Sequence, residues 1–342
     1  MRVLGQGLTA IGRHGPALLV LSLLLGGAVA PLATAAYQVL PLSAFLLTLG
    51  SFLTAALAPL EKGLGWRRIL LVVTWVGLGV PLLAAAIVLP LHLDPALQAG
   101  VLLSVLAPPV GSAAAIAAIL GLQPRLALIA SLALTLVAPL SMPAFATVLG
   151  VNVSIDMVHL AWRLALIIGL AAILAQMARH WRSKVQAVLP DQSAAAGVAV
   201  IGLVIVGLAM MSGIRGHWAT DPDAFGLFIA AAIGVNLGAG LVGALLFSSW
   251  GTKDAFTVGL VSGNRNVTLA WAAAGSTLPM ATEAYVAACV LPVLALPLAI
   301  KSVLAVRARL IPVIGRQKPA QQLRVMRVAP PVSPTSTGSS KS

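Results

Sequence analysis

The residue with the most distinctive chemistry is Arg265, which lies in the middle of a long apolar stretch of the chain. Residues 261–266 read Val-Ser-Gly-Asn-Arg-Asn, so three of its neighbours are also polar. An arginine at the centre of a membrane helix costs about 2.5–3.5 kcal/mol on insertion scales, so it indicates a function. Its guanidinium group could donate to carbonyls that a broken helix leaves free, or it could bind the carboxylate or sulfonate of an organic anion. If the stretch is placed differently in the membrane, the side chain instead reaches the surface.

A second apolar stretch is interrupted in a related way. Residues 107–112 read Ala-Pro-Pro-Val-Gly-Ser, and both prolines lack the amide proton that a helix needs. Gly111 and Gly263 are 152 positions apart, which is about half of the apolar region. Carriers often place their sites where two broken helices, in corresponding positions of repeated halves, expose backbone groups. The two breaks are therefore predicted to meet near the membrane midplane.

The candidate site consists of the residues at these two breaks. The glycines permit close backbone approach, Asn264 and Asn266 can cap free backbone groups, and Ser112 can either cap the following helix or donate to a substrate. The site residues on this basis are Pro108, Pro109, Gly111, Ser112, Gly263, Asn264, Arg265 and Asn266.

The remaining residues exclude several classes of chemistry. One cysteine, Cys289, rules out an intrachain disulfide. The sequence has no Ser/His/Asp constellation, no metal-ligand cluster and no phosphate-binding glycine loop, so we expect no enzyme and no cofactor. A carboxylate proton relay also lacks its residue, because no Asp or Glu lies well inside an apolar stretch.

Composition defines the elements that must hold this site. The 342 residues are 60% apolar and 8% charged, with a mean hydropathy of +1.03, so the chain is expected to be an all-α polytopic membrane protein. A spanning helix needs about 20 apolar residues. Because the breaks fall in the fourth and ninth stretches, an odd unit of five helices is repeated, and the two halves must be inverted. The ten expected spans are 15–34, 38–58, 68–91, 96–120, 125–149, 157–178, 195–214, 224–248, 254–277 and 283–305.

The basic residues predict the orientation of these spans. With the N-terminus in the cytoplasm, 18 of the 21 Lys and Arg fall on the cytoplasmic side, the exceptions being Arg163, Arg215 and Arg265. This distribution makes nucleic acid an unsuitable partner for the net charge of +13. We expect both termini in the cytoplasm of a bacterial-type inner membrane, a short N-terminal segment 1–14, a transmembrane domain 15–306 and a basic disordered tail 307–342. The alternative for the first span is a cleaved signal peptide.

Two stretches resemble a known family. Residues 106–144, with the break 107–112 and the run Leu-Val-Ala-Pro-Leu-Ser-Met-Pro-Ala at 136–144, resemble the fourth and fifth helices of the bile acid:sodium symporter family. Residues 258–270 resemble its ninth helix. The resemblance implies a panel of helices 1, 2, 6 and 7 and a core of helices 3–5 and 8–10, in which helices 4 and 9 cross. It also implies secondary transport of an organic anion by alternating access.

The sequence departs from this family at the sodium ligands, although Ser131 in the fifth span is retained. Sodium needs several hard oxygen ligands, so we expect transport without sodium coupling. Arg265 then either substitutes for the bound sodium, which its alignment with a sodium ligand favours, or binds the substrate anion. The family's serine, asparagine, glutamate and two glutamines align with Ala113, Ala114, Val261, Arg265 and Val76.

Two other functions stay open. One is an arsenite-type efflux carrier of the related fold, which would place a cysteine where this chain has Pro109. The other is a membrane sensor that uses the carrier fold without turnover. For the leading interpretation, the expected partners are the lipid bilayer and a small organic anion.

Overall fold

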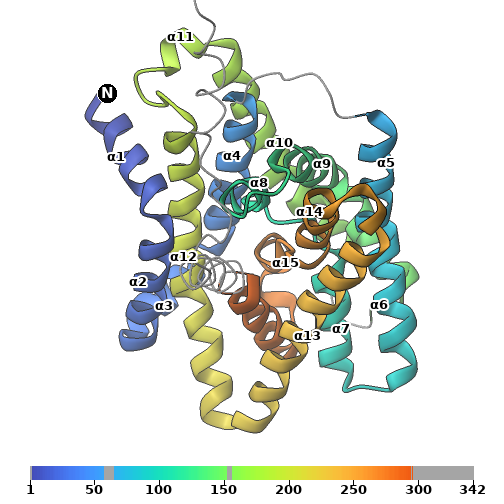
Figure 1. Ribbon diagram of the computed structural model, residues 1–342. Coiled ribbons are helices and arrows are strands. Elements are labelled where there is room, and N and C mark those ends of the chain that lie inside the picture. The colour runs from blue at the N-terminus through green and yellow to red at the C-terminus, as the bar shows by residue number, and fades with distance from the viewer. Residues whose placement is uncertain (1, 58–64, 152–155, 294, 296–342) are drawn as a thin grey trace, which may run out of the picture. The chain divides into compact units, whose positions relative to one another are not determined.

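The structure is a computed structural model that describes residues 2–57, 65–151, 156–293 and 295. Within these residues the regular structure is helical, apart from one isolated bridge between Pro109 and Arg265 (Figure 1). In chain order the helices are α1 (Arg2–Arg13), α2 (Gly15–Ala28), α3 (Ala30–Gln38), α4 (Leu40–Leu57), α5 (Trp66–Thr74), the π-helical turn η1 (Trp75–Gly79), α6 (Val80–Val88), η2 (Leu89–Leu91), α7 (Pro95–Leu106), α8 (Ala113–Ile119), α9 (Pro124–Val148), α10 (Met157–His180), α11 (Arg182–Val185), α12 (Gln192–Thr220), α13 (Pro222–Leu246), η3 (Ser248–Trp250), α14 (Thr252–Gly263), α15 (Val267–Ala274), η4 (Gly275–Thr277) and the helix Met280–Val293.

Six helical stretches are long and apolar enough to cross a membrane, which indicates a membrane protein. A seventh span results if α1 and α2, which are bent by 81° relative to one another, are counted together. The expected spans 96–120 and 254–277 are each divided into two shorter helices. The last expected span, 283–305, is described only up to residue 293 and at 295, and the tail 307–342 lies outside the described residues. The six stretches are Leu40–Leu57, Trp66–Leu91, Pro124–Val148, Met157–His180, Gln192–Thr220 and Pro222–Leu246.

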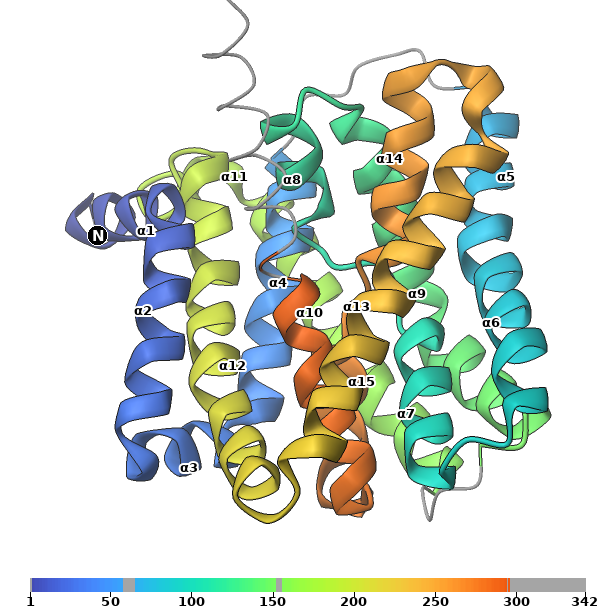
Figure 2. The same ribbon diagram turned by 60° about the horizontal axis from the view of Figure 1, so that its bottom comes forward.

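The first expected helix, 15–34, is wrong in its extent. The helix ends at Ala28, and Val29 has an extended backbone (φ −117°, ψ 90°) before α3 begins. Pro31 explains the break, because a proline inside a continuous helix removes one hydrogen bond and its ring clashes with the preceding turn. Figure 2 shows α3 turning away from the direction of α2 before α4 returns through the bundle.

We name two sets of helices after the division expected from the sequence. The panel helices are α2, α4, α10 and α12, in which α12 packs against α2 and α4, and α10 packs against α4. The core helices are α5–α9 and α13–α15, with α13 on α14 and α8 on α9. The groups meet where α10 contacts α9 and α15, and where α4 contacts α15.

Three aspartates mark the starts of helices at one end of this arrangement. Asp94, Asp156 and Asp221 accept hydrogen bonds from backbone amides in the first turns of α7, α10 and α13. Such N-caps satisfy donors that a helix start leaves free. All three helices start at the bottom of Figure 2, so these acidic residues lie at the same end of the bundle.

Candidate functional site

Both predicted helix breaks are confirmed. The helix α7 ends at Leu106 and α8 begins at Ala113, while α14 ends at Gly263 and α15 begins at Val267. Pro108 and Pro109 account for the first break, since neither can donate a helical hydrogen bond. The two interruptions bring the backbone out of the helical pattern in the interior of the bundle (Figure 2).

The two breaks pair with one another through the backbone. The amide of Val110 donates to the carbonyl of Asn264 at 2.9 Å, and the amide of Asn266 donates to the carbonyl of Pro108 at 2.7 Å. These bonds form the isolated antiparallel bridge between Pro109 and Arg265. Buried backbone groups need such partners, and here each break supplies the partners that the other lacks.

The side chain of Arg265 joins three elements at this crossing. It is only 4% exposed, and its Nε donates to the carbonyl of Ser262 at 2.8 Å. Its Nη1 donates to the carbonyl of Ala107 at 3.2 Å, and its Nη2 donates to the carbonyl of Val76 at 3.0 Å. The guanidinium therefore links η1, the end of α7 and the end of α14.

The positions of these three carbonyls explain why they attract a cation. Ala107 and Ser262 lie at the C-terminal ends of α7 and α14, where helix dipoles carry partial negative charge. Val76 lies in the π-helical turn η1, an irregularity of a kind that is frequent at functional sites. No ion pair of the described residues involves Arg265, since the one found there joins Arg68 and Asp254 at 2.9 Å. The buried charge is thus balanced by carbonyl dipoles.

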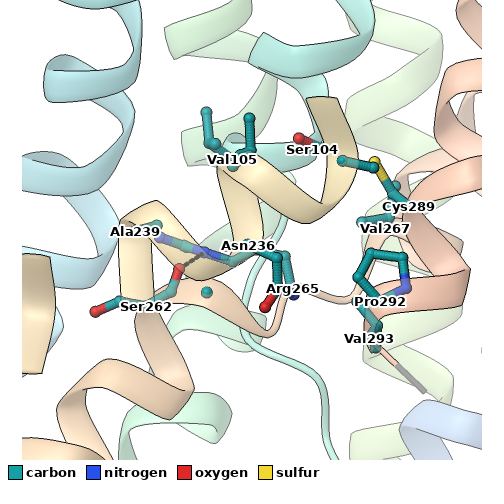
Figure 3. A pocket seen from close by; sticks show the side chains of 13 residues that line it. Ser104, Val105, Asn236, Ala239, Ser262, Arg265, Val267, Cys289, Pro292 and Val293 are labelled. Carbon is teal, nitrogen blue, oxygen red and sulfur yellow. Dashed lines mark hydrogen bonds between the residues drawn. The ribbon is translucent and has the colours of Figure 1, made fainter. Parts of the chain in front are cut away.

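A small pocket of about 20 Å³ lies next to Arg265 (Figure 3). Ser104 of α7, Asn236 of α13 and Cys289 line it together with the arginine. Asn236 therefore belongs to the surroundings of the site, and the lone cysteine is a buried neighbour of the arginine and not a part of either break.

The glycines of both breaks allow close contact with neighbouring helices, as predicted. A Cβ atom at Gly111 would overlap the side chain of Ser51 on α4, and a Cβ at Gly263 would overlap the backbone carbonyl of Asn236 on α13. Gly111 therefore brings the first break against a panel helix, whereas Gly263 brings the second break against a core helix.

Several polar side chains at the crossing lack hydrogen-bond partners. Ser131 and Asn264 are 2% and 3% exposed, and the hydroxyl of the serine and both polar atoms of the asparagine are unpaired. Ser112 and Asn266 precede α8 and α15 without a capping bond from their side chains. The predicted capping by Ser112 and Asn266 is therefore wrong, because hydrogen bonds between the two breaks already satisfy some of the free backbone groups. Buried unpaired polar groups in a native protein call for an explanation.

One of these unpaired groups faces a second small pocket. This pocket, of about 10 Å³, lies between the panel helix α4, the core helix α9 and the two breaks, and we call it the interface pocket. A space of this size holds about one water molecule. Its lining includes Ser131, Gly111 and Asn266 from the predicted site, together with Thr48, Ser51 and Thr135.

The last three of these residues were missed by the sequence reasoning. Thr135 is four positions after Ser131, and Ser51 is three positions after Thr48, so each pair lies on one face of its helix. Hydroxyl pairs at helical spacing were the signal that could have found them. Of the positions aligned with the family's sodium ligands, Ala113, Val261 and Val76 are fully buried and carry no side-chain oxygen.

Within the described residues, no group of three or more His, Cys, Asp or Glu side chains could hold a metal ion. A scan of protein-family models and a search of curated proteins found no match to this chain.

Proposed function

We propose that this chain is a secondary carrier for an organic anion such as a carboxylate or sulfonate. In this proposal ten spans form two inverted repeats, as in the bile acid:sodium symporter family, with both termini in the cytoplasm of a bacterial-type inner membrane. The observation that carries it is the crossing of two broken helices, joined by backbone hydrogen bonds, next to polar side chains without partners. Crossings of broken helices are the usual sites of secondary carriers.

The interface pocket is the proposed position of the anion's charged group. It lies beside Asn266, which precedes α15, and a helix N-terminus favours negative charge. Ser131 supplies an unpaired hydroxyl, and the side-chain amide of Asn266 supplies N–H donors. These groups can donate to a carboxylate or sulfonate without any bound cation.

The proposed role of Arg265 is to replace a cation at the opposite ends of the broken helices. Three of its nitrogens already donate to carbonyls of Ser262, Ala107 and Val76. A sodium ion would be coordinated by oxygens of the same kind. Direct binding of the substrate by Arg265 has less support, since these carbonyls occupy its guanidinium. Transport is therefore proposed to proceed without sodium.

The mechanism proposed is movement of the core helices relative to the panel helices. The interface pocket has a volume of about 10 Å³, which is too small for an organic anion. Because α4 forms one wall and α9 another, separation of the two groups would enlarge it. The arsenite alternative has less support, as Cys289 lies in the pocket beside Arg265 and not at a break.

The proposal is tested by flux measurements in proteoliposomes. Labelled organic anions are offered with sodium, potassium and pH gradients imposed separately. We expect flux of at least one carboxylate or sulfonate, unchanged when potassium replaces sodium. A saturable dependence on sodium would overturn the cation-replacement role, and specific anion binding without flux would favour the sensor alternative.

A further inference from the structure

A larger cavity, of about 380 Å³, lies between α6 and α13 and extends over α7. We call it the α6–α13 groove. Its walls consist of one tryptophan, Trp75, two glycines, and otherwise alanine, valine, leucine and isoleucine. The groove and the interface pocket have no lining residue in common, so they are separate.

The groove offers a ligand no free polar group. The one polar side-chain atom in its lining is Nε1 of Trp75, and it already donates to the hydroxyl of Ser262 at 3.0 Å. The volume is far larger than one water molecule needs, yet apolar cavities stay dry. An empty groove would leave its lining without dispersion contacts. The chemistry therefore favours a hydrocarbon occupant.

The groove opens toward the hydrocarbon phase of a membrane. Its two walls, α6 and α13, both belong to stretches long and apolar enough to span a bilayer. Leu82 on α6 and Leu237 and Leu241 on α13 are exposed beside it. On α13, Gly234 and Gly238 line the groove, and a Cβ atom at either position would meet nothing within 4 Å.

We propose that the α6–α13 groove binds one acyl chain of a zwitterionic bilayer phospholipid. A helix with its side chains is about 10–12 Å across, so a groove of 380 Å³ is too small for a helix of a second protein, whereas a single hydrocarbon chain is thin enough. Leu93 lines the groove, and the next residue is Asp94, an exposed residue whose carboxylate caps α7. That carboxylate attracts the ammonium of a zwitterionic headgroup and repels the carboxylate of a free fatty acid.

A chain in this groove packs against the back of the crossing. Val105, Val235 and Ala239 line both the groove and the small pocket beside Arg265. The acyl chain therefore completes the packing of residues that separate the buried arginine from the membrane. This inference does not depend on the proposed transport function.

Photolabelling of the full chain in phosphatidylcholine vesicles tests the proposal. A small fraction of the phospholipid carries a diazirine in one acyl chain, and adducts are mapped by peptide mass spectrometry after irradiation. We expect the groove segments 80–88 and 231–242 to be labelled about tenfold more than the exposed face of α10, an excess equivalent to about two extra buried methylene groups.

Matched variants of α13 complete the experiment. Gly238→Phe places a ring in the groove and should abolish the excess labelling, whereas Gly226→Phe, at an exposed glycine outside the groove with equal space around it, should preserve it. Gly234→Leu is the second variant if Gly238→Phe does not fold. Uniform labelling of all exposed faces, or unchanged labelling in both groove variants, would overturn the proposal. Stronger labelling by the same chain as a free fatty acid would overturn the assignment to phospholipid.

Discussion

At the level of single residues, Arg265 owes its position to backbone carbonyls and not to an acidic partner. Its three carbonyl contacts lie at two helix C-termini and one π-helical turn. These are places where regular helical bonding leaves acceptors available. Removal of the guanidinium would destabilise the protein, because the buried carbonyls that it bonds would be left without donors.

We therefore expect Arg265→Gln to lower the free energy of unfolding by at least about 2 kcal/mol, because each buried carbonyl left without a donor costs about 1–3 kcal/mol. The shorter amide cannot reach all three carbonyls. Chemical unfolding of the purified protein measures the loss. Lys253→Gln is the control, since it removes an exposed positive charge from the start of the same helix, α14. Equal stability of both variants would contradict the structural role.

A combined variant separates the two roles proposed for Arg265. Arg265→Gln together with Val261→Glu, Ala113→Ser and Ala114→Asn rebuilds the side-chain ligands that the resembling family places at these positions. If the arginine replaces a cation, flux of the anion in this variant should depend on sodium. The same variant without Val261→Glu should lack that dependence, since no anionic ligand is present. Loss of anion flux that sodium does not recover would instead assign the substrate to Arg265.

Ser131 allows function and stability to be distinguished. Its hydroxyl is buried without a partner, so Ser131→Ala should leave the free energy of unfolding unchanged or raise it by about 1 kcal/mol. Anion flux should nevertheless fall, because the interface pocket loses a donor. Ser43→Ala is the matched control, as that buried hydroxyl on α4 already donates to Leu40 and lies outside the pocket. Unchanged flux in Ser131→Ala would remove this residue from the site.

At the level of elements, the sequence was most informative where covalent structure restricts the backbone. Pro108 and Pro109 made the first break predictable, and a glycine among polar residues made the second predictable. The same rule applied to Pro31 would have ended the first helix at Ala28. Neither the turn η1 nor the hydrogen bond from Arg265 to the carbonyl of Val76 was predictable. Both depend on which segments tertiary packing brings to Arg265.

The contact between the first break and α4 gives a prediction at this scale. A Cβ at Gly111 would overlap Ser51, so Gly111→Ala should destabilise the protein by about 1–3 kcal/mol, as overpacking does. Adding Ser51→Gly should recover part of the loss, because it removes the overlapping atoms. Gly169→Ala on α10 is the control, since nothing lies within 4 Å of that position. A Gly111→Ala variant as stable as this control would show that α4 can move away freely.

At the level of the described bundle, side chains from α3, α15 and the helix Met280–Val293 lie close together. Glu283 accepts a hydrogen bond from Nε1 of Trp271 at 2.9 Å, and its carboxylate interacts electrostatically with Tyr37 on α3. Arg163 on α10 donates to the carbonyl of Ala273 on α15 at 3.5 Å. In the proposed mechanism, movement of α15 relative to α10 would break the contact between Arg163 and Ala273.

The link between Tyr37 and Glu283 is expected to persist at neutral pH and to weaken in alkali. Burial raises the pKa of Tyr37 above its ordinary value of 10, and interaction with the carboxylate of Glu283 raises it further. A pKa raised by folding contributes stability that is complete below about pH 10 and is lost as the pH rises toward the folded value. The free energy of unfolding should therefore fall above about pH 10, and Tyr37→Phe should lack this part of the fall.

At neutral pH, hydrogen exchange in segments 33–38 and 271–277 should be faster in Tyr37→Phe, because α3 is less firmly held to the core. Glu283→Gln should produce a similar increase, and adding Tyr37→Phe to it should change little, since both substitutions weaken one shared contact. Independent, additive effects of the two substitutions would show that Tyr37 and Glu283 do not act together.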